Sequence, residues 1–266
     1  MTMKKTLTLA GSDSSGGAGI QADLKTFQEH NVYGMTALTS IVTMNPEQNW
    51  SHGVYPIDVT IVEEQLNTIL SVGIDAMKTG MLGSVEIINL GARKIDEFHL
   101  DKVVIDPVMV CKGEDEVLQP ENTDAMRELL LPRALITTPN LFEAGQLAQT
   151  GPIKSIDDMR HAAVKIHELG VKNVVIKGGK ALDHEKALDL FYDGTEFTLL
   201  EEDKIDTTYN HGAGCTFAAA ITANLALGKT VKDSVTAAKL FTTAAIKHGW
   251  KLNQYVGPVM HGAYHK

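Results

Sequence analysis

The sequence predicts an α/β fold of three layers, in which helices cover both faces of a doubly wound, mostly parallel central sheet. Two observations lead to this prediction. Short apolar runs rich in β-branched residues alternate along the chain with longer amphipathic stretches, as strands and helices do in such folds. Most of the short runs are apolar throughout, which is typical of strands buried on both faces of a parallel sheet.

The chain of 266 residues is long enough for one large domain, and we expect a single domain over residues 1–266. Strands are predicted, in order, at residues 6–10, 37–44, 76–79, 103–106, 134–138 and 173–177. Helices are predicted at residues 20–30, 59–72, 85–98, 122–130, 141–149, 156–169, 215–227 and 231–248. A β-hairpin is predicted over residues 187–200, around Asp193 and Gly194. Ligands of such sheets bind beyond the carboxyl ends of the strands, so the loops there are the candidate site.

Composition excludes several classes of function. The formal net charge of -9 and the isoelectric point near 5.5 argue against nucleic acid or an anionic membrane as the main partner. No uninterrupted apolar run approaches the length of a membrane span, and the apolar stretch near the N-terminus is too short for a signal peptide. Cys111 and Cys215 are too few for a disulfide framework and are predicted to be free thiols. We therefore expect a cytoplasmic protein.

The segment NHGAGCT, residues 210–216, is the most informative part of the chain, because a long apolar run follows it at once. Its small residues let the backbone turn sharply and approach a ligand. The start of the helix expected there has unpaired N–H groups that attract anions. Cys215 at that start is predicted to ionise easily, with a pKa lowered from about 8.5 to about 3.5–7.5. An anion hole beside a reactive group suits phosphoryl transfer.

Four further segments allow two interpretations each. The loop GSDSSGGAG, residues 11–19, fits neither the Rossmann nor the P-loop pattern; it is either a tight turn or a platform for a planar substrate. Asn140 and Glu143 are either a cap with a dipole-compensating carboxylate, or a phosphate contact with a carboxylate for hydrated Mg²⁺. Lys177 beside two glycines is either a solvated turn or a phosphate contact. Cys111 is either a core residue or an exposed loop thiol.

The order of these motifs is more specific than any one of them. The series reads AGSDSSGGAGIQADLKTF, MKTGML, DPVMVCKG, TPNLFEA, KGG and HGAGCTFAAA. It resembles the ribokinase-like vitamin kinases, in the branch that holds hydroxymethylpyrimidine kinases and bacterial pyridoxal kinases. The resemblance runs from Thr6 to about Pro258 and implies a ribokinase-like fold, ATP and Mg²⁺ as cofactors, and a homodimer.

The resemblance also implies roles for individual residues. Gly212, Ala213 and Gly214 would form the anion hole, and Cys215 would stand where most ribokinase-like enzymes have an aspartate as general base. The implied ATP contacts are Asn140, Lys177, Gly178, Gly179, Gly214 and Lys239, and Glu143 would hold Mg²⁺ through water. The implied substrate contacts are Asp23, Met44, Met81, Val108 and Cys111.

Two positions bear on the substrate. Hydroxymethylpyrimidine kinases usually carry Gln, which can hydrogen-bond the aminopyrimidine, where this chain has Met44. They also tend to have Ala where this chain has Cys111, whose thiol could add to the aldehyde of pyridoxal. The resemblance therefore favours an ATP-dependent kinase that phosphorylates the 5′-hydroxymethyl group of pyridoxal, and also of pyridoxine and pyridoxamine. The alternatives are a hydroxymethylpyrimidine (phosphate) kinase of thiamine biosynthesis and a non-catalytic sensor of vitamers or nucleotides.

Overall fold

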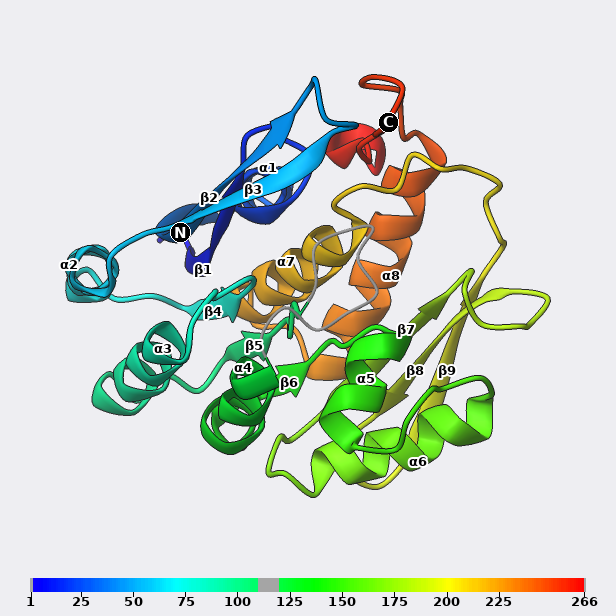
Figure 1. The fold of residues 1–266 in the computed structure, drawn as a ribbon. Coiled ribbons are helices and arrows are strands. Elements are labelled where there is room, and N and C mark those ends of the chain that lie inside the picture. Colours follow the sequence, from blue (N-terminus) through cyan, green and yellow to red (C-terminus); the bar gives the residue numbers. More distant parts are fainter. Residues whose placement is uncertain (1, 110–119, 266) are drawn as a thin grey trace.

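The computed structural model describes residues 2–109 and 120–265. A single nine-stranded sheet runs through it, in the order β3-β2-β1-β4-β5-β6-β7-β8-β9 (Figure 1). The strands are β1 (Lys5–Asp13), β2 (Tyr33–Asn45), β3 (Ser51–Pro56), β4 (Ala76–Thr79), β5 (Val103–Ile105), β6 (Ile136–Thr137), β7 (Val174–Gly179), β8 (Ala187–Tyr192) and β9 (Phe197–Glu202). From β2 to β7 all neighbours are parallel, whereas β3, β8 and β9 pair antiparallel at the two edges.

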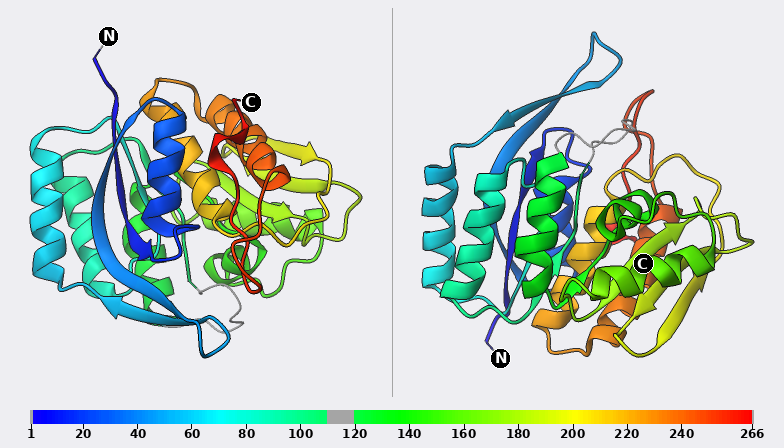
Figure 2. Two further views of the ribbon diagram at one scale, coloured as in Figure 1. Left: turned by 90° about the horizontal axis from the view of Figure 1, so that it is seen from above. Right: turned by 60° about the horizontal axis from the view of Figure 1, so that its bottom comes forward.

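Helices cover both faces of this sheet, as Figure 2 shows from two further directions, so the predicted three-layer α/β fold is confirmed. The helices are α1 (Gly19–Glu29), α2 (Val59–Ser71), α3 (Val85–Glu97), α4 (Pro120–Ala125), α5 (Leu141–Ala148), α6 (Ile156–His167), α7 (Ala213–Ala226) and α8 (Val231–Lys247). A π-helical turn and a 3-10 turn, Met126–Leu130 and Leu131–Arg133, prolong α4, and a 3-10 turn His261–Ala263 lies near the C-terminus. Among the described residues, no helix combines the length and the apolar character needed to cross a bilayer.

Successive residues of the central strands point to opposite layers, which explains their continuous apolar sequence. Val103 and Ile105 of β5 pack in the core formed with α2 to α6, whereas Val104 between them packs against α7 and α8. Helix α7 is buried from Thr216 to Ala226, and its small side chains let α1 and α8 pack closely on it. The central position of α7 brings its N-terminus to the carboxyl edge of the parallel strands.

The structure corrects the predicted strands in several places. Residues 51–56, which the sequence analysis left in a loop, form β3 and pair with Ser40–Asn45 of β2. Most of β3 is exposed, so it lacks the apolar run by which the other strands are recognised. The strands β1 and β7 also run further than predicted, to Asp13 and Gly179. An irregularity in the pairing interrupts each extension, after Ala10 in β1 and after Lys177 in β7.

Candidate active site

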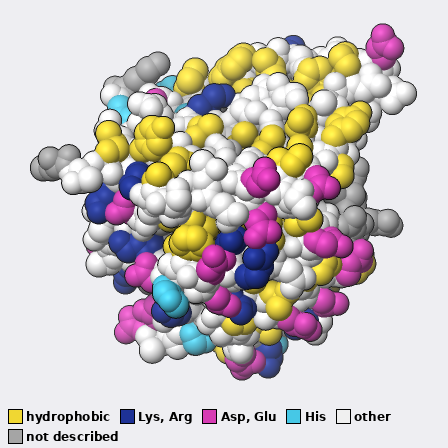
Figure 3. Space-filling view, turned by 90° about the vertical axis from the view of Figure 1, so that its left-hand side faces the viewer, with side chains coloured by type: hydrophobic (Ala, Val, Ile, Leu, Met, Phe, Trp, Pro, Cys, Tyr) yellow, Lys and Arg dark blue, Asp and Glu magenta, His cyan; other side chains and the backbone are white. Residues whose placement is uncertain are grey.

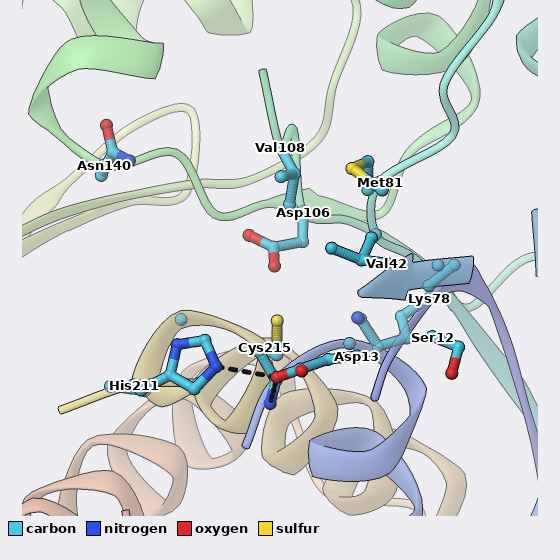
Figure 4. A pocket seen from close by; sticks show the side chains of 18 of the residues that line it. Ser12, Asp13, Val42, Lys78, Met81, Asp106, Val108, Asn140, His211 and Cys215 are labelled. Atoms are coloured by element: carbon cyan, nitrogen blue, oxygen red, sulfur yellow. Dashed lines mark hydrogen bonds and ion pairs between the residues drawn. The ribbon is translucent and has the colours of Figure 1, made fainter. Parts of the chain in front are cut away.

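A cavity of about 400 Å³ opens at the carboxyl ends of β1, β4 and β5, bounded by the start of α7 and by the β2–β3 hairpin (Figure 4). Its wall combines charged groups with apolar side chains. The lining residues are Ala10, Gly11, Ser12, Asp13, Ala18, Gly19, Val42, Met44, His52, Lys78, Gly80, Met81, Asp106, Val108, Asn140, Glu143, Lys177, Asn210, His211, Gly212, Ala213, Gly214 and Cys215. We refer to it as the acceptor cavity.

A second cavity, of about 380 Å³, lies between β7, β8, α7 and α8. It is lined by Asn140, Lys177, Gly179, Lys180, Ala187, Asp189, Asp203, Ile205, Thr207, Asn210, Ala213, Gly214, Phe217, Lys239, Thr242, Thr243 and Ile246. We refer to it as the nucleotide cavity. The residues that line both cavities are Asn140, Lys177, Asn210, Ala213 and Gly214. The two cavities therefore meet over the start of α7.

The start of α7 leaves backbone donors open to this junction. Gly212 is the N-cap, has a left-handed conformation with φ +82°, and gives the helix no side-chain cap. The N–H groups of Gly214 and Cys215 have no hydrogen-bond acceptor within the part of the chain that the structure describes. The N–H of Ala213, which the resemblance placed in the anion hole, instead donates to the carbonyl of Asn210 at 3.1 Å. The ammonium group of Lys177 lies directly over Gly214. Free amides and a cation together make an anion site at the junction.

Lys177 is held in place by carboxylates. Its Nζ lies 3.0 Å from Oδ1 of Asp106, whose side chain is almost completely buried. Burial disfavours the charged amine, but the negative charges of Asp106 and Glu143 outweigh it and raise the pKa of Lys177. The ammonium group is therefore charged at neutral pH, with Asp106 fixing its position.

Asn140 and Glu143 form a capping box at the start of α5. Oδ1 of Asn140 accepts a hydrogen bond from the N–H of Glu143 at 2.9 Å, and Oε2 of Glu143 accepts one from the N–H of Asn140 at 2.8 Å. Burial raises the pKa of Glu143 to about 7; the charge of Lys177 opposes this shift and that of Asp106 adds to it. Both residues still line the acceptor cavity, so the cap and a ligand contact are compatible.

Sequence similarity shows which family this chain belongs to. Residues 13–260 match the family model described as phosphomethylpyrimidine kinase. The chain belongs to this kinase family. Pyridoxine kinase of Bacillus subtilis (strain 168) is 61% identical over 264 residues, which are 99% of this chain and 97% of that protein.

Solved structures of relatives agree with the fold over nearly the whole chain. The ADP complex of Bacillus subtilis pyridoxal kinase has a TM-score of 0.97 at 60% identity, covering 99% of both chains. The complex of Staphylococcus aureus pyridoxal kinase with AMP-PCP and pyridoxal has a TM-score of 0.95 at 55% identity, covering 100% of this chain and 96% of that one. The predicted resemblance to ribokinase-like vitamin kinases is thereby confirmed.

The kinase fold brings most of the implied site residues to the two cavities. Met44, Met81 and Val108 line the acceptor cavity, and Met44 lies opposite His52 in the β2–β3 pairing. Lys239 lines the nucleotide cavity, where its Nζ lies 2.8 Å from Oδ2 of Asp189. Gly179 lines the same cavity. Cys111 lies outside the described residues.

Two implied contacts do not reach a cavity. Asp23 is fully buried; its carboxylate pairs with Nζ of Lys78 at 2.9 Å and accepts a hydrogen bond from Thr8 at 2.6 Å. It is Lys78, and not Asp23, that lines the acceptor cavity, so Lys78 stands between Asp23 and the cavity. Gly178 faces the backbone of Leu188, where a Cβ would overlap the carbonyl oxygen, because the alternation of β7 turns it away from the nucleotide.

The predicted easy ionisation of Cys215 is wrong. Its thiol points into the acceptor cavity (Figure 4), but burial raises its pKa to about 12. The charge of Lys78 and a hydrogen bond from the N–H of Gly19 lower the pKa by less than burial raises it. Removal of water from the sulfur thus outweighs the favourable helix start, and Cys215 is a neutral thiol in this kinase at neutral pH.

The sequence analysis also missed several residues of the site. Asp106 and Lys78, which supply charge to the acceptor cavity, stood in the predicted strands and in the motifs DPVMVCKG and MKTGML, but they were given no role. A charged residue that ends or interrupts an otherwise apolar, buried strand is the signal that could have identified both. Asp13 and His211 were likewise given no role, although they lie within the two glycine-rich segments, residues 11–19 and 210–216.

Proposed function

We propose that this protein is an ATP-dependent pyridoxal kinase. It transfers the γ-phosphoryl group of ATP to the 5′-hydroxymethyl group of pyridoxal, giving pyridoxal 5′-phosphate, and also accepts pyridoxine and pyridoxamine. The observation that carries the proposal is the meeting of the two cavities over the uncapped start of α7, beneath the ammonium group of Lys177. An acceptor and a nucleotide bound on either side would face one another across an anion site.

The chain's own groups account for alignment and charge stabilisation. The amides of Gly214 and Cys215 and the ammonium of Lys177 are arranged to hold the moving phosphoryl group, whose negative charge they would neutralise. Lys239 and Gly179 lie on the nucleotide side. The residues that line both cavities are half-buried, and this partial exclusion of water strengthens these interactions relative to bulk water.

Cys215 is assigned to orienting the acceptor hydroxyl. Its pKa of about 12 makes the thiolate rare at neutral pH, so the sulfur does not remove the proton before the reaction begins. A loose transition state for phosphoryl transfer places little charge on the acceptor oxygen until late. The thiol can therefore orient the hydroxyl group through a hydrogen bond, while the hydroxyl proton passes to an oxygen of the transferred phosphoryl group as the new bond to phosphorus forms.

The residues at the junction fit a magnesium ion bound through water. Asp106 and Glu143 are nearly buried carboxylates that line one cavity, and the charge of Asp106 adds to the burial that raises the pKa of Glu143; a divalent cation would relieve this repulsion. No group of three or more His, Cys, Asp or Glu side chains within residues 2–109 and 120–265 could hold a metal ion alone. Mg²⁺ keeps waters and takes few protein ligands beside phosphates. It would supply charge neutralisation for the triphosphate, with Glu143 and Asp106 as its protein contacts.

Acceptor preference follows from the apolar part of the acceptor cavity. Met44 offers no hydrogen-bond pair for the polar edge of an aminopyrimidine, so that edge would lose its partners on burial. A kinase of hydroxymethylpyrimidine is therefore the second candidate. The thiol of Cys111 could add to the aldehyde of pyridoxal, which also favours pyridoxal over hydroxymethylpyrimidine as the acceptor.

We also propose a homodimer in the cytoplasm. Figure 3 shows hydrophobic side chains gathered over the upper half of the side where β2 and β3 lie, and charges of both signs below them. Ile41, Val54 and Tyr55 of these two strands are exposed, and an exposed apolar edge of a sheet favours association with a second copy. The thiol of Cys215 is free, in keeping with a reducing compartment.

Mass spectrometry of reaction products tests the proposal directly. The protein is incubated with ATP, Mg²⁺ and, in parallel, pyridoxal, pyridoxine, pyridoxamine and hydroxymethylpyrimidine. We expect the three vitamers to gain one phosphoryl group, with pyridoxal preferred over hydroxymethylpyrimidine. Preferred phosphorylation of the pyrimidine would support the second candidate, and tight binding of a vitamer without release of ADP would support a sensor.

A further inference from the structure

The end of β1 and the residue before the anion hole meet in one buried contact. Asp13 and His211 are 198 positions apart in sequence, and Nε2 of His211 lies 2.7 Å from Oδ2 of Asp13 (Figure 4). Both residues line the acceptor cavity but are more than nine-tenths buried. Neither was among the expected site residues, and neither has a role in the mechanism given above.

Asp13 fixes the acceptor loop, residues 14–18, to the end of β1. Its Oδ1 accepts a hydrogen bond from the N–H of Ser15 at 2.8 Å. Its Oδ2 accepts hydrogen bonds from the N–H of Ala18 at 2.8 Å and of Gly17 at 3.2 Å, besides the one from His211. Burial disfavours the carboxylate, but these hydrogen bonds, above all that of His211, hold the pKa of Asp13 well below its usual range.

His211 joins the same carboxylate to the anion hole. Its backbone N–H donates to the carbonyl of Gly257 at 3.0 Å, and its carbonyl accepts from the N–H of Val259 at 3.2 Å, so the residue is held on both sides. Its ring lies against Gly17, where a Cβ would overlap Cδ2 of the imidazole. Gly212, the next residue, lies so close to the carbonyl of Gly17 that it too has no room for a side chain.

We propose that Asp13 and His211 form a positioning pair for phosphoryl transfer, acting through the backbone of residues 212–215. The carboxylate of Asp13 fixes the acceptor loop, and the imidazole of His211 links that loop to the backbone amides that hold the phosphoryl group. The acceptor hydroxyl and the anion hole are thereby kept in one alignment. This inference rests on the proposed kinase function and assigns it two further residues.

The expected effect is large because alignment dominates this kind of catalysis. A misplacement of about 1 Å at a reacting centre costs on the order of 10²-fold in rate. Loss of the pair would move the amides relative to the acceptor without removing any group that contacts the adenosine. The turnover number should therefore fall while the KM for ATP stays nearly constant.

Two variants of His211 separate positioning from simple packing. We expect His211→Ala to lower kcat by about 10²-fold, with the KM for ATP changed by less than about three-fold. His211→Gln keeps an N–H donor at a similar distance from the backbone and should retain kcat to within about five-fold of the unmodified protein. The isosteric Asp13→Asn, which removes the charge and one acceptor, should lower kcat as His211→Ala does.

His261 supplies the matched control. It is also a buried histidine that contacts α7, since its Nε2 lies 3.0 Å from Oγ1 of Thr216, but it touches neither cavity. His261→Ala should lower the midpoint of thermal unfolding about as much as His211→Ala, while kcat stays within about two-fold.

The decisive measurement is steady-state kinetics with pyridoxal, together with thermal unfolding of every variant. The doubly substituted Asp13→Asn, His211→Ala protein should lose no more kcat than either single variant, because the pair acts as a unit. Losses that multiply, a His211→Gln variant as slow as His211→Ala, or a His211→Ala variant as fast as His261→Ala would each overturn the proposal. Absence of turnover in the unmodified protein would instead contradict the kinase function itself.

Discussion

Two helices begin at the junction of the cavities, and they begin in opposite ways. Helix α5 has a complete capping box, in which Asn140 and Glu143 satisfy each other's backbone N–H groups. Helix α7 starts at Gly212 with no side-chain cap, and its amides at Gly214 and Cys215 are left open. The first helix therefore presents side chains to a ligand, and the second presents its backbone.

This difference explains the sequences at the two starts. Asn and Glu three positions apart stabilise a helix end and keep one face polar. A glycine with a positive φ angle at the start of α7 removes the side chain that would otherwise compete with a phosphate for the free amides. Stability is thus concentrated at one helix start, and anion binding at the other.

The largest expected effect comes from a substitution at the uncapped start of α7. Gly212→Ala would force a side chain into the carbonyl of Gly17 and into a left-handed conformation, which displaces the amides of the anion hole. We expect kcat to fall by about 10³-fold, as measured by steady-state kinetics. Gly228→Ala is the control, because Gly228 at the other end of α7 also has a positive φ of +88° but open space around it. That variant should lose about 1 kcal/mol of stability and no activity.

The next test concerns the thiol beside the open amides. Cys215→Ala should lower kcat by about 10²-fold, since the acceptor hydroxyl loses its orienting partner. In a Cys111→Ala background Cys215 is the one remaining thiol. Its rate of alkylation by iodoacetamide should rise with pH to at least pH 10, because its pKa is about 12. A plateau of the rate below pH 8 would show a thiolate at neutral pH and contradict the role proposed for the sulfur.

The capped start of α5 is tested by the pH dependence of the free energy of unfolding. The folded-state pKa of Glu143 is raised from 4.5 to about 7, so the folded protein favours the protonated side chain. Glu143 therefore contributes stability below pH 4.5 that is lost as the pH rises toward 7. Relative to Glu143→Gln, which keeps the cap without the charge, the free energy of unfolding should fall by up to about 3 kcal/mol over this range.

Asp158 is the matched control for this pH test. It occupies the equivalent position in the capping box of α6, but it is exposed, and hydrogen bonds from Lys154 and Ser155 lower its pKa. Its contribution to stability is present above its ordinary pKa and is lost as the pH falls. Urea unfolding of Asp158→Asn should therefore show the opposite pH dependence; the same sign in both variants would contradict the burial effect at Glu143.

The smallest expected effect separates capping from ligand binding at Asn140. Asn140→Ala should lower the free energy of unfolding by about 1 kcal/mol and raise the KM for ATP, because Asn140 lines both cavities. Ser84→Ala removes a cap of the same kind from α3 and should cost similar stability without changing the KM. Equal KM values in the two variants would leave Asn140 with a capping role alone.

The sequence was sufficient to predict the helices and strands that bury apolar side chains. The strands of the parallel region and their helices were predictable because these strands carry runs of buried, mostly apolar side chains. Strand β3 was not, since the sequence SHGVYP is mostly exposed and is held by pairing with β2. An edge strand that is held by backbone pairing and buries few apolar side chains leaves little trace in local hydrophobicity.

For the site, the residue types were predictable and their environments were not. The sequence indicated a cysteine at a helix start, but the burial that raises the pKa of Cys215 depends on how α1, α7 and the strands pack together. Asp23 lies in a motif shared with vitamin kinases, yet its carboxylate is turned inward to Lys78. The contact between Asp13 and His211 joins segments 198 residues apart, which no local pattern specifies.

The acceptor cavity and the nucleotide cavity share only a few lining residues and are otherwise separate. This arrangement has an evolutionary consequence. The residues beyond the shared ones come from different parts of the chain: the β2–β3 hairpin on the acceptor side, and β8 with α8 on the nucleotide side. Substitutions in the hairpin can thus alter which alcohol is selected while the phosphate donor stays the same. New acceptor preferences can arise in this architecture without rebuilding its chemistry.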